Sequence, residues 1–225
     1  MNTHLKILLA GQKRFGRDVF EMIREEGHEV VAAVCPVTPE SPDKLWIAAS
    51  NTDTPIIRAG TLTAETCPDC DLIVTAHSHD FIGRRTRLKA RLGAIGYHPS
   101  LLPLHRGRDA IRWTIRMRER VTGGSVYWLS ETVDGGPIAA QQHVFVRPDD
   151  DDLELWIREL APLGVKLLRK VVRDVAAGRI VRQPQDPALA TWEPSITGSP
   201  RLFRPDLLLL PAPGQKFEQY INSIA

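Results

Sequence analysis

The first 34 residues alternate between short apolar runs and one amphipathic segment, and this pattern restricts the fold more than any other feature. Residues 5–10 (LKILLA) and 30–34 (VVAAV) are apolar enough to form buried strands. Between them, residues 14–27 carry apolar side chains at helical spacing and end in glycine. A strand, a helix and a strand in this order form a right-handed crossover between parallel strands. The pattern therefore predicts an α/β fold with a mostly parallel sheet.

Further apolar runs continue this pattern, so we expect a Rossmann-like, mostly parallel twisted sheet flanked by helices. The sequence predicts strands at 55–57, 71–76, 94–97, 124–129 and 138–146, and helices at 44–50, 84–92 and 109–118. A long helix is predicted from the acidic run at Asp149 to about Gly178, with a bend at Pro162. Proline recurs afterwards, which predicts a domain over residues 1–180 and a short irregular C-terminal extension over residues 181–225. Within that extension, the apolar run at Leu207–Leu210 is either a strand or a partner contact.

The composition is that of an ordinary globular protein and excludes several classes. The chain has 225 residues, 43% of them hydrophobic and 25% charged, which is enough for one well-buried core. A net charge of only +2 argues against a dedicated nucleic-acid surface. No apolar run approaches 18 residues, and no leader pattern opens the chain. We therefore expect a soluble, cytoplasmic protein without a membrane partner, and leave its oligomeric state open, a homodimer included.

Two groups of residues have spacings that metals use, and neither predicts a metal site. Cys67 and Cys70 form a C-x-x-C pair, but no second cysteine pair follows, so reduced thiols are the simpler interpretation. His77 and His79 share one face of an extended chain, a spacing that zinc can use. No third ligand is evident near them in the sequence.

The strongest candidate for a functional segment is residues 98–107 (HPSLLPLHRG). Pro99 and Pro103 prevent a helix or a central strand from continuing through it. The segment must therefore leave the predicted strand 94–97 as a stiff turn, with His98 at the carboxyl end of that strand. Open α/β sheets bind ligands at the carboxyl ends of their strands. The pattern indicates a polar group held beside a rigid apolar wall.

This segment, followed by TVDGGPI at residues 132–138, resembles the pair of signatures found in folate-dependent formyltransferases. That family includes methionyl-tRNA formyltransferase, glycinamide ribonucleotide formyltransferase and sugar N-formyltransferases, and the resemblance spans about residues 5–180. It implies transfer of a formyl group from 10-formyltetrahydrofolate to an amine. It also implies that His98 stabilises the oxyanion of the tetrahedral intermediate, with Asp134 as its electrostatic partner and proton acceptor. The folate pocket would be lined by His79, Phe81, Ile82, Leu101, Thr132 and Val133.

Taken singly, the two candidate catalytic residues also have structural interpretations. His98 before a proline fits a turn histidine, and Asp134 before two glycines fits a turn aspartate that accepts backbone N–H groups.

Gly96 departs from the family pattern, which has an asparagine there. Three readings stay open: another donor such as His79 or Tyr97 compensates, a larger acceptor or altered cofactor fills the space, or the protein is slow, hydrolytic or inactive in transfer.

The acceptor is predicted to be a small-molecule amine such as an amino sugar. The tRNA-formylating members of the family carry a further C-terminal domain, whereas here residues 181–225 are proline-rich and lack a basic stripe. Three alternatives remain: a methionyl-tRNA acceptor, hydrolysis of 10-formyltetrahydrofolate, and a folate-binding module that has lost catalysis.

Overall fold

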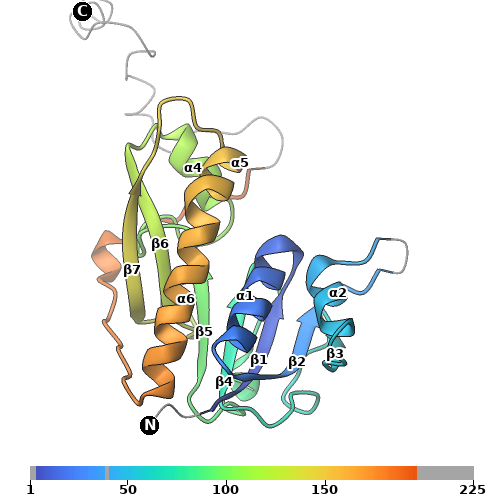
Figure 1. Ribbon diagram of the computed structural model, residues 1–225. Helices are drawn as coiled ribbons and strands as arrows, with labels where there is room; N and C mark the ends of the chain where they lie inside the picture. Colours follow the sequence, from blue (N-terminus) through green and yellow to red (C-terminus); the bar gives the residue numbers. More distant parts are fainter. Residues whose placement is uncertain (1–3, 39–40, 197–225) are drawn as a thin grey trace, which may run out of the picture.

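The computed structural model describes residues 4–38 and 41–196, and shows one seven-stranded sheet (Figure 1). The strands are β1 (Lys6–Gly11), β2 (Glu29–Cys35), β3 (Ile56–Arg58), β4 (Leu72–Ala76), β5 (Ala94–His98), β6 (Val121–Trp128) and β7 (Ile138–Phe145). Their order is β3-β2-β1-β4-β5-β6-β7. The pairs from β3 to β5 are parallel, and β6 and β7 are antiparallel additions. The predicted α/β fold with a mostly parallel sheet is confirmed.

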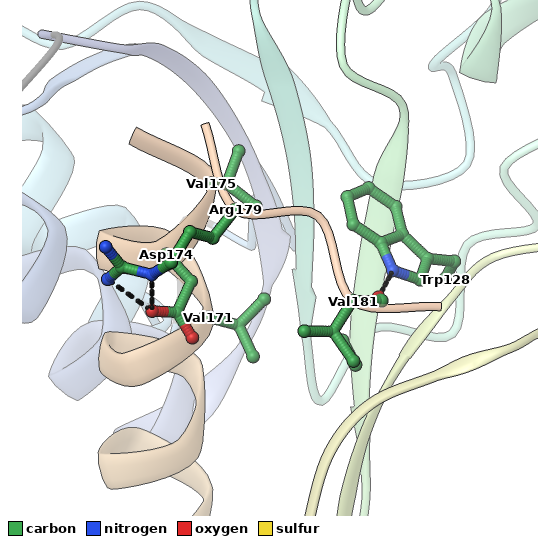
Figure 2. Close-up of a pocket in the computed structure, with 7 residues that line it drawn as sticks. Trp128, Val171, Asp174, Val175, Arg179 and Val181 are labelled. Carbon is green, nitrogen blue, oxygen red and sulfur yellow. Dashed lines mark hydrogen bonds and ion pairs between the residues drawn. The ribbon is translucent and has the colours of Figure 1, made fainter. Parts of the chain in front are cut away.

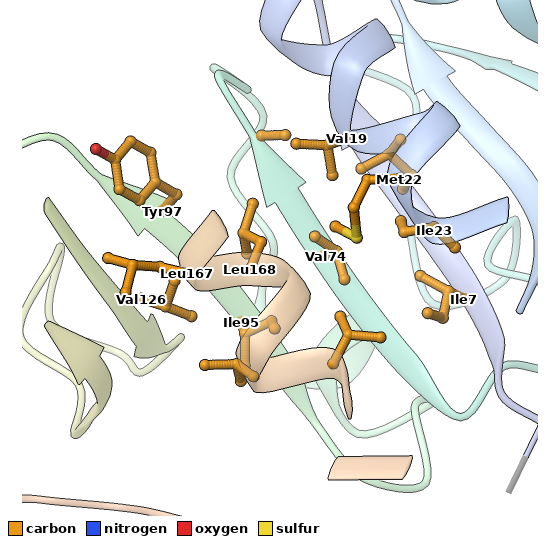
Figure 3. Packing of buried hydrophobic residues seen from close by; sticks show 14 of the residues in the cluster. Ile7, Val19, Met22, Ile23, Val74, Ile95, Tyr97, Val126, Leu167 and Leu168 are labelled. Carbon is orange, nitrogen blue, oxygen red and sulfur yellow. The ribbon is translucent and has the colours of Figure 1, made fainter. Parts of the chain in front are cut away.

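The main core lies between the sheet and two long helices. The helices are α1 (Lys13–Glu25), α2 (Lys44–Ser50), α3 (Arg84–Arg87), α4 (Ala110–Arg116), α5 (Asp152–Leu155) and α6 (Ala161–Ala176). Helices α1 and α6 cover the same face of the sheet (Figure 1). Figure 3 shows Val19 and Met22 of α1 and Leu168 of α6 packed towards Val74 and Ile95 of the central strands. Burial of these apolar side chains is the main favourable contribution to folding.

The opposite face of the sheet carries a smaller apolar cluster. Along β1, Ile7 and Leu9 point into the main core, whereas Leu8 and Ala10 point into this second cluster. A strand buried on both faces reads as a continuous apolar run, which explains the sequence of β1. Cys70 also belongs to the second cluster, and burial raises the pKa of its thiol to about 12, so the group is protonated at neutral pH.

Two predicted helices differ from those observed. The helix expected at residues 84–92 is a single turn, because Arg91 and Leu92 donate backbone hydrogen bonds to Cys70 and Asp71 instead of continuing the helix. The helix expected from Asp149 to Gly178 contains a π-helical segment, Trp156–Leu160, followed directly by α6. Pro162 lies in the first turn of α6, where its missing N–H has no helical partner to lose.

The chain turns back onto the sheet after α6. Gly178 adopts a φ of +76°, which ends the helix, and Arg179 then pairs with Asp174. Figure 2 shows this pair on one side of a small pocket and Trp128 of β6 on the other, where the indole N–H donates to the carbonyl of Val181 at 2.7 Å. Within residues 4–38 and 41–196, no helix combines the length and the apolar character needed to cross a membrane.

Candidate functional site

His98 ends β5 and is almost completely buried beside Asp134. Its Nδ1 atom is 3.5 Å from Asp134 Oδ2, and its Nε2 atom is 2.7 Å from the backbone oxygen of His105. A carbonyl oxygen only accepts hydrogen bonds, so Nε2 carries the proton of that contact. The nitrogen that faces the carboxylate is therefore Nδ1. The two residues that are 36 positions apart in sequence are neighbours in the structure.

The Asp134 carboxylate has a hydrogen-bond donor on each oxygen. Oδ2 accepts from the backbone N–H of Gly107 at 2.7 Å, and Oδ1 accepts from the hydroxyl of Tyr127 at 2.5 Å. The residue itself has a φ of +50° in a glycine-rich turn. That turn approaches β6 so closely that a Cβ atom on Gly136 would lie 1.7 Å from the Trp128 carbonyl oxygen. Asp134 thus accepts a backbone N–H, as a turn aspartate does, and also faces the histidine.

A buried hydroxyl holds the proline-rich turn in place. Ser125 is the register partner of His98 on β6 and is fully buried. Its hydroxyl donates to the Ser100 carbonyl at 2.6 Å and accepts from the Leu102 N–H at 3.1 Å and from the Gln141 side chain at 2.8 Å. All its hydrogen-bonding capacity is used. Sequence reasoning missed this residue, although a serine inside an apolar strand was a signal for it.

His105, at the end of the same turn, lies between two carboxylates. Its Nε2 is 3.0 Å from Glu119 Oε1, and its Nδ1 is 3.0 Å from Glu193 Oε2. The contact with Glu193 is an ion pair whose geometry does not make a hydrogen bond. Burial alone lowers the pKa of His105, but the two carboxylates outweigh it and raise the pKa to about 9. Its backbone N–H donates to Thr191 Oγ1 at 2.8 Å. The described part of the C-terminal segment therefore supports the turn that carries His98.

Most of the residues expected to line the folate pocket lie on two segments of the chain, one after β4 and one before Asp134. His79, Phe81 and Ile82 follow β4, and Thr132 and Val133 precede Asp134. An ion pair between Arg84 and Glu131, 3.7 Å long, connects the two segments. The exposures differ: Phe81 is 75% exposed and Val133 51%, whereas Ile82 packs into the second apolar cluster.

The last residue expected to line the pocket, Leu101, and the histidine pair lie outside these contacts. Leu101 is half-buried in the turn after β5. The rings of His77 and His79 have centroids 5.8 Å apart. Within residues 4–38 and 41–196, no group of three potential metal ligands is present.

Gly96 has no free space beside it for a side chain. A Cβ atom there would lie 2.5 Å from the Thr75 hydroxyl and 3.4 Å from the Tyr127 ring. Tyr97, considered as a compensating donor, has its hydroxyl bonded to the Leu160 carbonyl at 2.7 Å and packs in the main core. Its hydroxyl is therefore committed elsewhere, and the hydroxyl next to Gly96 is that of Thr75.

The arrangement as a whole defines an α/β protein with a candidate acid–base site at the carboxyl end of a central strand. A buried imidazole beside a carboxylate can exchange a proton and can stabilise a negative oxygen. Residues 60–172, half of the chain, match the protein family described as formyl transferase. The chain belongs to the formyl transferase family.

Curated relatives and solved structures agree with this assignment. The chain is 35% identical over 201 residues to mitochondrial 10-formyltetrahydrofolate dehydrogenase of Mus musculus, covering 84% of this chain and 22% of the relative. It is 30% identical over 210 residues to methionyl-tRNA formyltransferase of Lactobacillus delbrueckii subsp. bulgaricus, covering 85% of this chain and 64% of the relative. The chain thus spans less than a quarter of the dehydrogenase and under two thirds of the formyltransferase.

Among solved structures, the N-formyltransferase of Helicobacter canadensis has a TM-score of 0.70 at 18% identity, covering 84% of this chain and 70% of that one. Glycinamide ribonucleotide transformylase 1 of Symbiobacterium toebii has a TM-score of 0.68, also at 18% identity, covering 81% and 93%. At this identity the two structures establish a shared fold.

Proposed function

We propose that this chain takes a formyl group from 10-formyltetrahydrofolate and transfers it to an amine. The observation that carries the proposal is the buried pair of His98 and Asp134, with Nδ1 and Oδ2 3.5 Å apart where β5 ends. The identity of the donor is supported by the dehydrogenase relatives, which are named for 10-formyltetrahydrofolate, and by the H. canadensis structure, which contains folinic acid.

The proposed reaction begins when the amine nitrogen attacks the formyl carbon, which creates a negative oxygen and a positive nitrogen. His98, whose Nε2–H is held by the His105 carbonyl and whose Nδ1 faces Asp134, stabilises the oxygen through the positive charge of its imidazolium. Asp134 stabilises the imidazolium and accepts the amine proton, directly or through a water molecule. The tetrahedral centre then collapses: the bond between the formyl carbon and the folate nitrogen breaks, and that nitrogen takes up the proton that the amine lost to Asp134. The His105 carbonyl fixes which imidazole nitrogen faces Asp134, since it holds Nε2–H.

The folate is proposed to lie between the two segments that the Arg84–Glu131 pair connects. His79, Phe81 and Ile82 would border it from one side, and Leu101, Thr132 and Val133 from the other. The exposed apolar side chains of Phe81 and Val133 support this placement, because an aromatic pteridine buries apolar surface on binding.

The domain division is also a proposal, with residues 1–180 as the catalytic domain and 181–225 as the extension. Contacts of the described part support a role for the extension at the site. Glu193 pairs with His105, and the Gln185 side chain donates to the Asp134 carbonyl at 2.8 Å.

For the acceptor, we favour a small-molecule amine such as an amino sugar. The H. canadensis N-formyltransferase structure contains dTDP-3-aminofucose, and the small net charge of this chain offers little attraction for tRNA. A second candidate acceptor is water, which would make the protein a hydrolase. Gly96 favours that alternative, because it supplies no side-chain donor to orient the formyl group.

One assay separates these functions. The full chain is incubated with 10-formyltetrahydrofolate, and tetrahydrofolate, formate and formylated amine are quantified with and without amino sugars. Tetrahydrofolate that forms only with an amine supports transfer, and formate released without an amine supports hydrolysis. Formylated methionyl-tRNA would identify the tRNA acceptor. Tight folate binding without turnover would identify a binding module, and no folate binding by the folded chain would reject the proposal.

The variants His98→Ala and Asp134→Asn test the catalytic pair directly. We expect each to lower turnover by about 100-fold or more, the usual contribution of a positioned acid or base. His143→Ala is the matched control, because His143 is exposed on β7. Full activity of His98→Ala would contradict the assignment.

A further inference from the structure

Tyr127 lies beneath the site in a position that the proposed mechanism does not yet use. It is the register partner of Gly96 across β5 and β6, and it is 7% exposed. Its hydroxyl donates to Asp134 Oδ1 at 2.5 Å. Burial, and then the charge of Asp134, raise the pKa of Tyr127 well above its usual value. The hydroxyl therefore stays protonated and stays a donor throughout the neutral range.

We propose that Tyr127 is a positioning residue that fixes the rotation of the Asp134 carboxylate, so that Oδ2 faces His98 Nδ1. The proposal rests on the proposed function of the His98–Asp134 pair. Its basis is that the two carboxylate oxygens have separate anchors: Gly107 N–H holds Oδ2, and the Tyr127 hydroxyl holds Oδ1. With one anchor the carboxylate can still turn about its bond to Cβ. With two, the oxygen that faces the imidazole is fixed.

The backbone next to this contact explains why a second anchor matters. Asp134 has a φ of +50°, a left-handed backbone conformation that costs free energy in residues other than glycine. A residue held in that conformation depends on its neighbours to keep its geometry. The backbone of Tyr127 lies in a strand that pairs on both sides, with β5 and with β7, and the β7 register shifts between Val126 and Tyr127. A strand inside the sheet therefore supplies the donor to a carboxylate on a strained turn.

Gly96 lies next to the Tyr127 ring. Thr75, Gly96 and Tyr127 are register partners on three adjacent strands, so their side chains share one face of the sheet. A Cβ atom on Gly96 would already be in van der Waals contact with the Tyr127 ring, at 3.4 Å from Cε1. A side chain at position 96 would therefore lie against the ring that carries the donor to Asp134.

The test is Tyr127→Phe, with Tyr97→Phe as the matched control. The two tyrosines lie on adjacent strands, both rings are buried, and each substitution removes one hydroxyl that donates a hydrogen bond to an oxygen. The Tyr97 hydroxyl, however, donates to the Leu160 carbonyl in the main core and not to Asp134. For Tyr127→Phe we expect kcat to fall roughly 10- to 100-fold, as when an orienting partner of a functional side chain is lost. KM for 10-formyltetrahydrofolate should stay unchanged.

The outcomes separate a positioning role from a structural one and from failure of the proposed function. A parent-like kcat in Tyr127→Phe overturns the proposal, and so does an equal loss in both variants, which would reflect general destabilisation. If the parent does not turn over, NMR of the His98 imidazole, assigned with His98→Ala, provides the readout. Ring signals that move in Tyr127→Phe and not in Tyr97→Phe support the contact without any activity, and unmoved signals overturn it.

Discussion

The charge of His105 should make the stability of this protein depend on pH in a specific window. The imidazole is 3% exposed between Glu119 and Glu193, which raise its pKa to about 9. In the unfolded chain the pKa returns to about 6.5. A pKa that is higher in the folded state contributes stability that is fully present below pH 6.5 and is lost as the pH rises through 9. The difference of about 2.5 units corresponds to about 3 kcal/mol of unfolding free energy.

The perturbation is Glu193→Gln, which removes one of the two carboxylates. His105 lowers the pKa of Glu193 against the opposing effect of burial, so the pair is mutually stabilising in the folded state. We expect Glu193→Gln to unfold more easily at pH 6 and to lose less stability than the parent between pH 6.5 and 9. The assay is urea unfolding followed by tryptophan fluorescence at pH values from 5.5 to 9.5, with Glu29→Gln, an exposed carboxylate on β2, as the control.

An identical pH dependence in the parent and in Glu193→Gln would refute this reasoning. So would a parent that is equally stable at pH 6 and pH 9. Because the His105 carbonyl also holds His98 Nε2, the same variant should lower formyl turnover even at a pH where it remains folded.

Three further substitutions test the packing around the site. Gly96→Asn should destabilise the fold by about 1–3 kcal/mol, because its Cβ would lie 2.5 Å from the Thr75 hydroxyl. In urea unfolding, adding Thr75→Ala should recover part of this loss of stability, and no loss at all in Gly96→Asn would contradict the tight contact. Gly136→Ala should be more severe, because the Trp128 carbonyl cannot move out of a strand; a soluble variant with unchanged melting temperature would exclude this. Ser125→Ala should lower the free energy of unfolding by about 1–3 kcal/mol, because it leaves the hydrogen-bond partners of the hydroxyl unpaired. Hydrogen exchange at the Leu102 N–H should become faster, and unchanged protection there would contradict the role of the serine hydroxyl in holding the turn.

Much of the fold followed from local patterns in the sequence. The strands β1, β2 and β4 are apolar on both faces, which is what a parallel sheet between two packed layers requires. The end of helix 84–92 was predicted too late, because the backbone of Arg91 and Leu92 bonds to residues before β4, and no local pattern reports such a partner. The π-helical segment before Pro162 was likewise missed; within it, the Leu160 carbonyl accepts a hydrogen bond from the Tyr97 hydroxyl of β5, a partner that no local pattern reports.

The sequence by itself determined the alternation of strands and helices, the stiff turn after His98 and the two motifs that resemble the formyltransferase signatures. Periodicity, proline geometry and short motifs are properties of neighbouring residues, so they can be read along the chain. Only the tertiary structure decided that Asp134 meets His98, that Tyr127 and Gly107 hold the carboxylate, and that Glu193 reaches back to His105. These contacts join residues 7 to 88 positions apart, and their pairing is fixed by the register of β5 and β6 and by the path of the C-terminal segment.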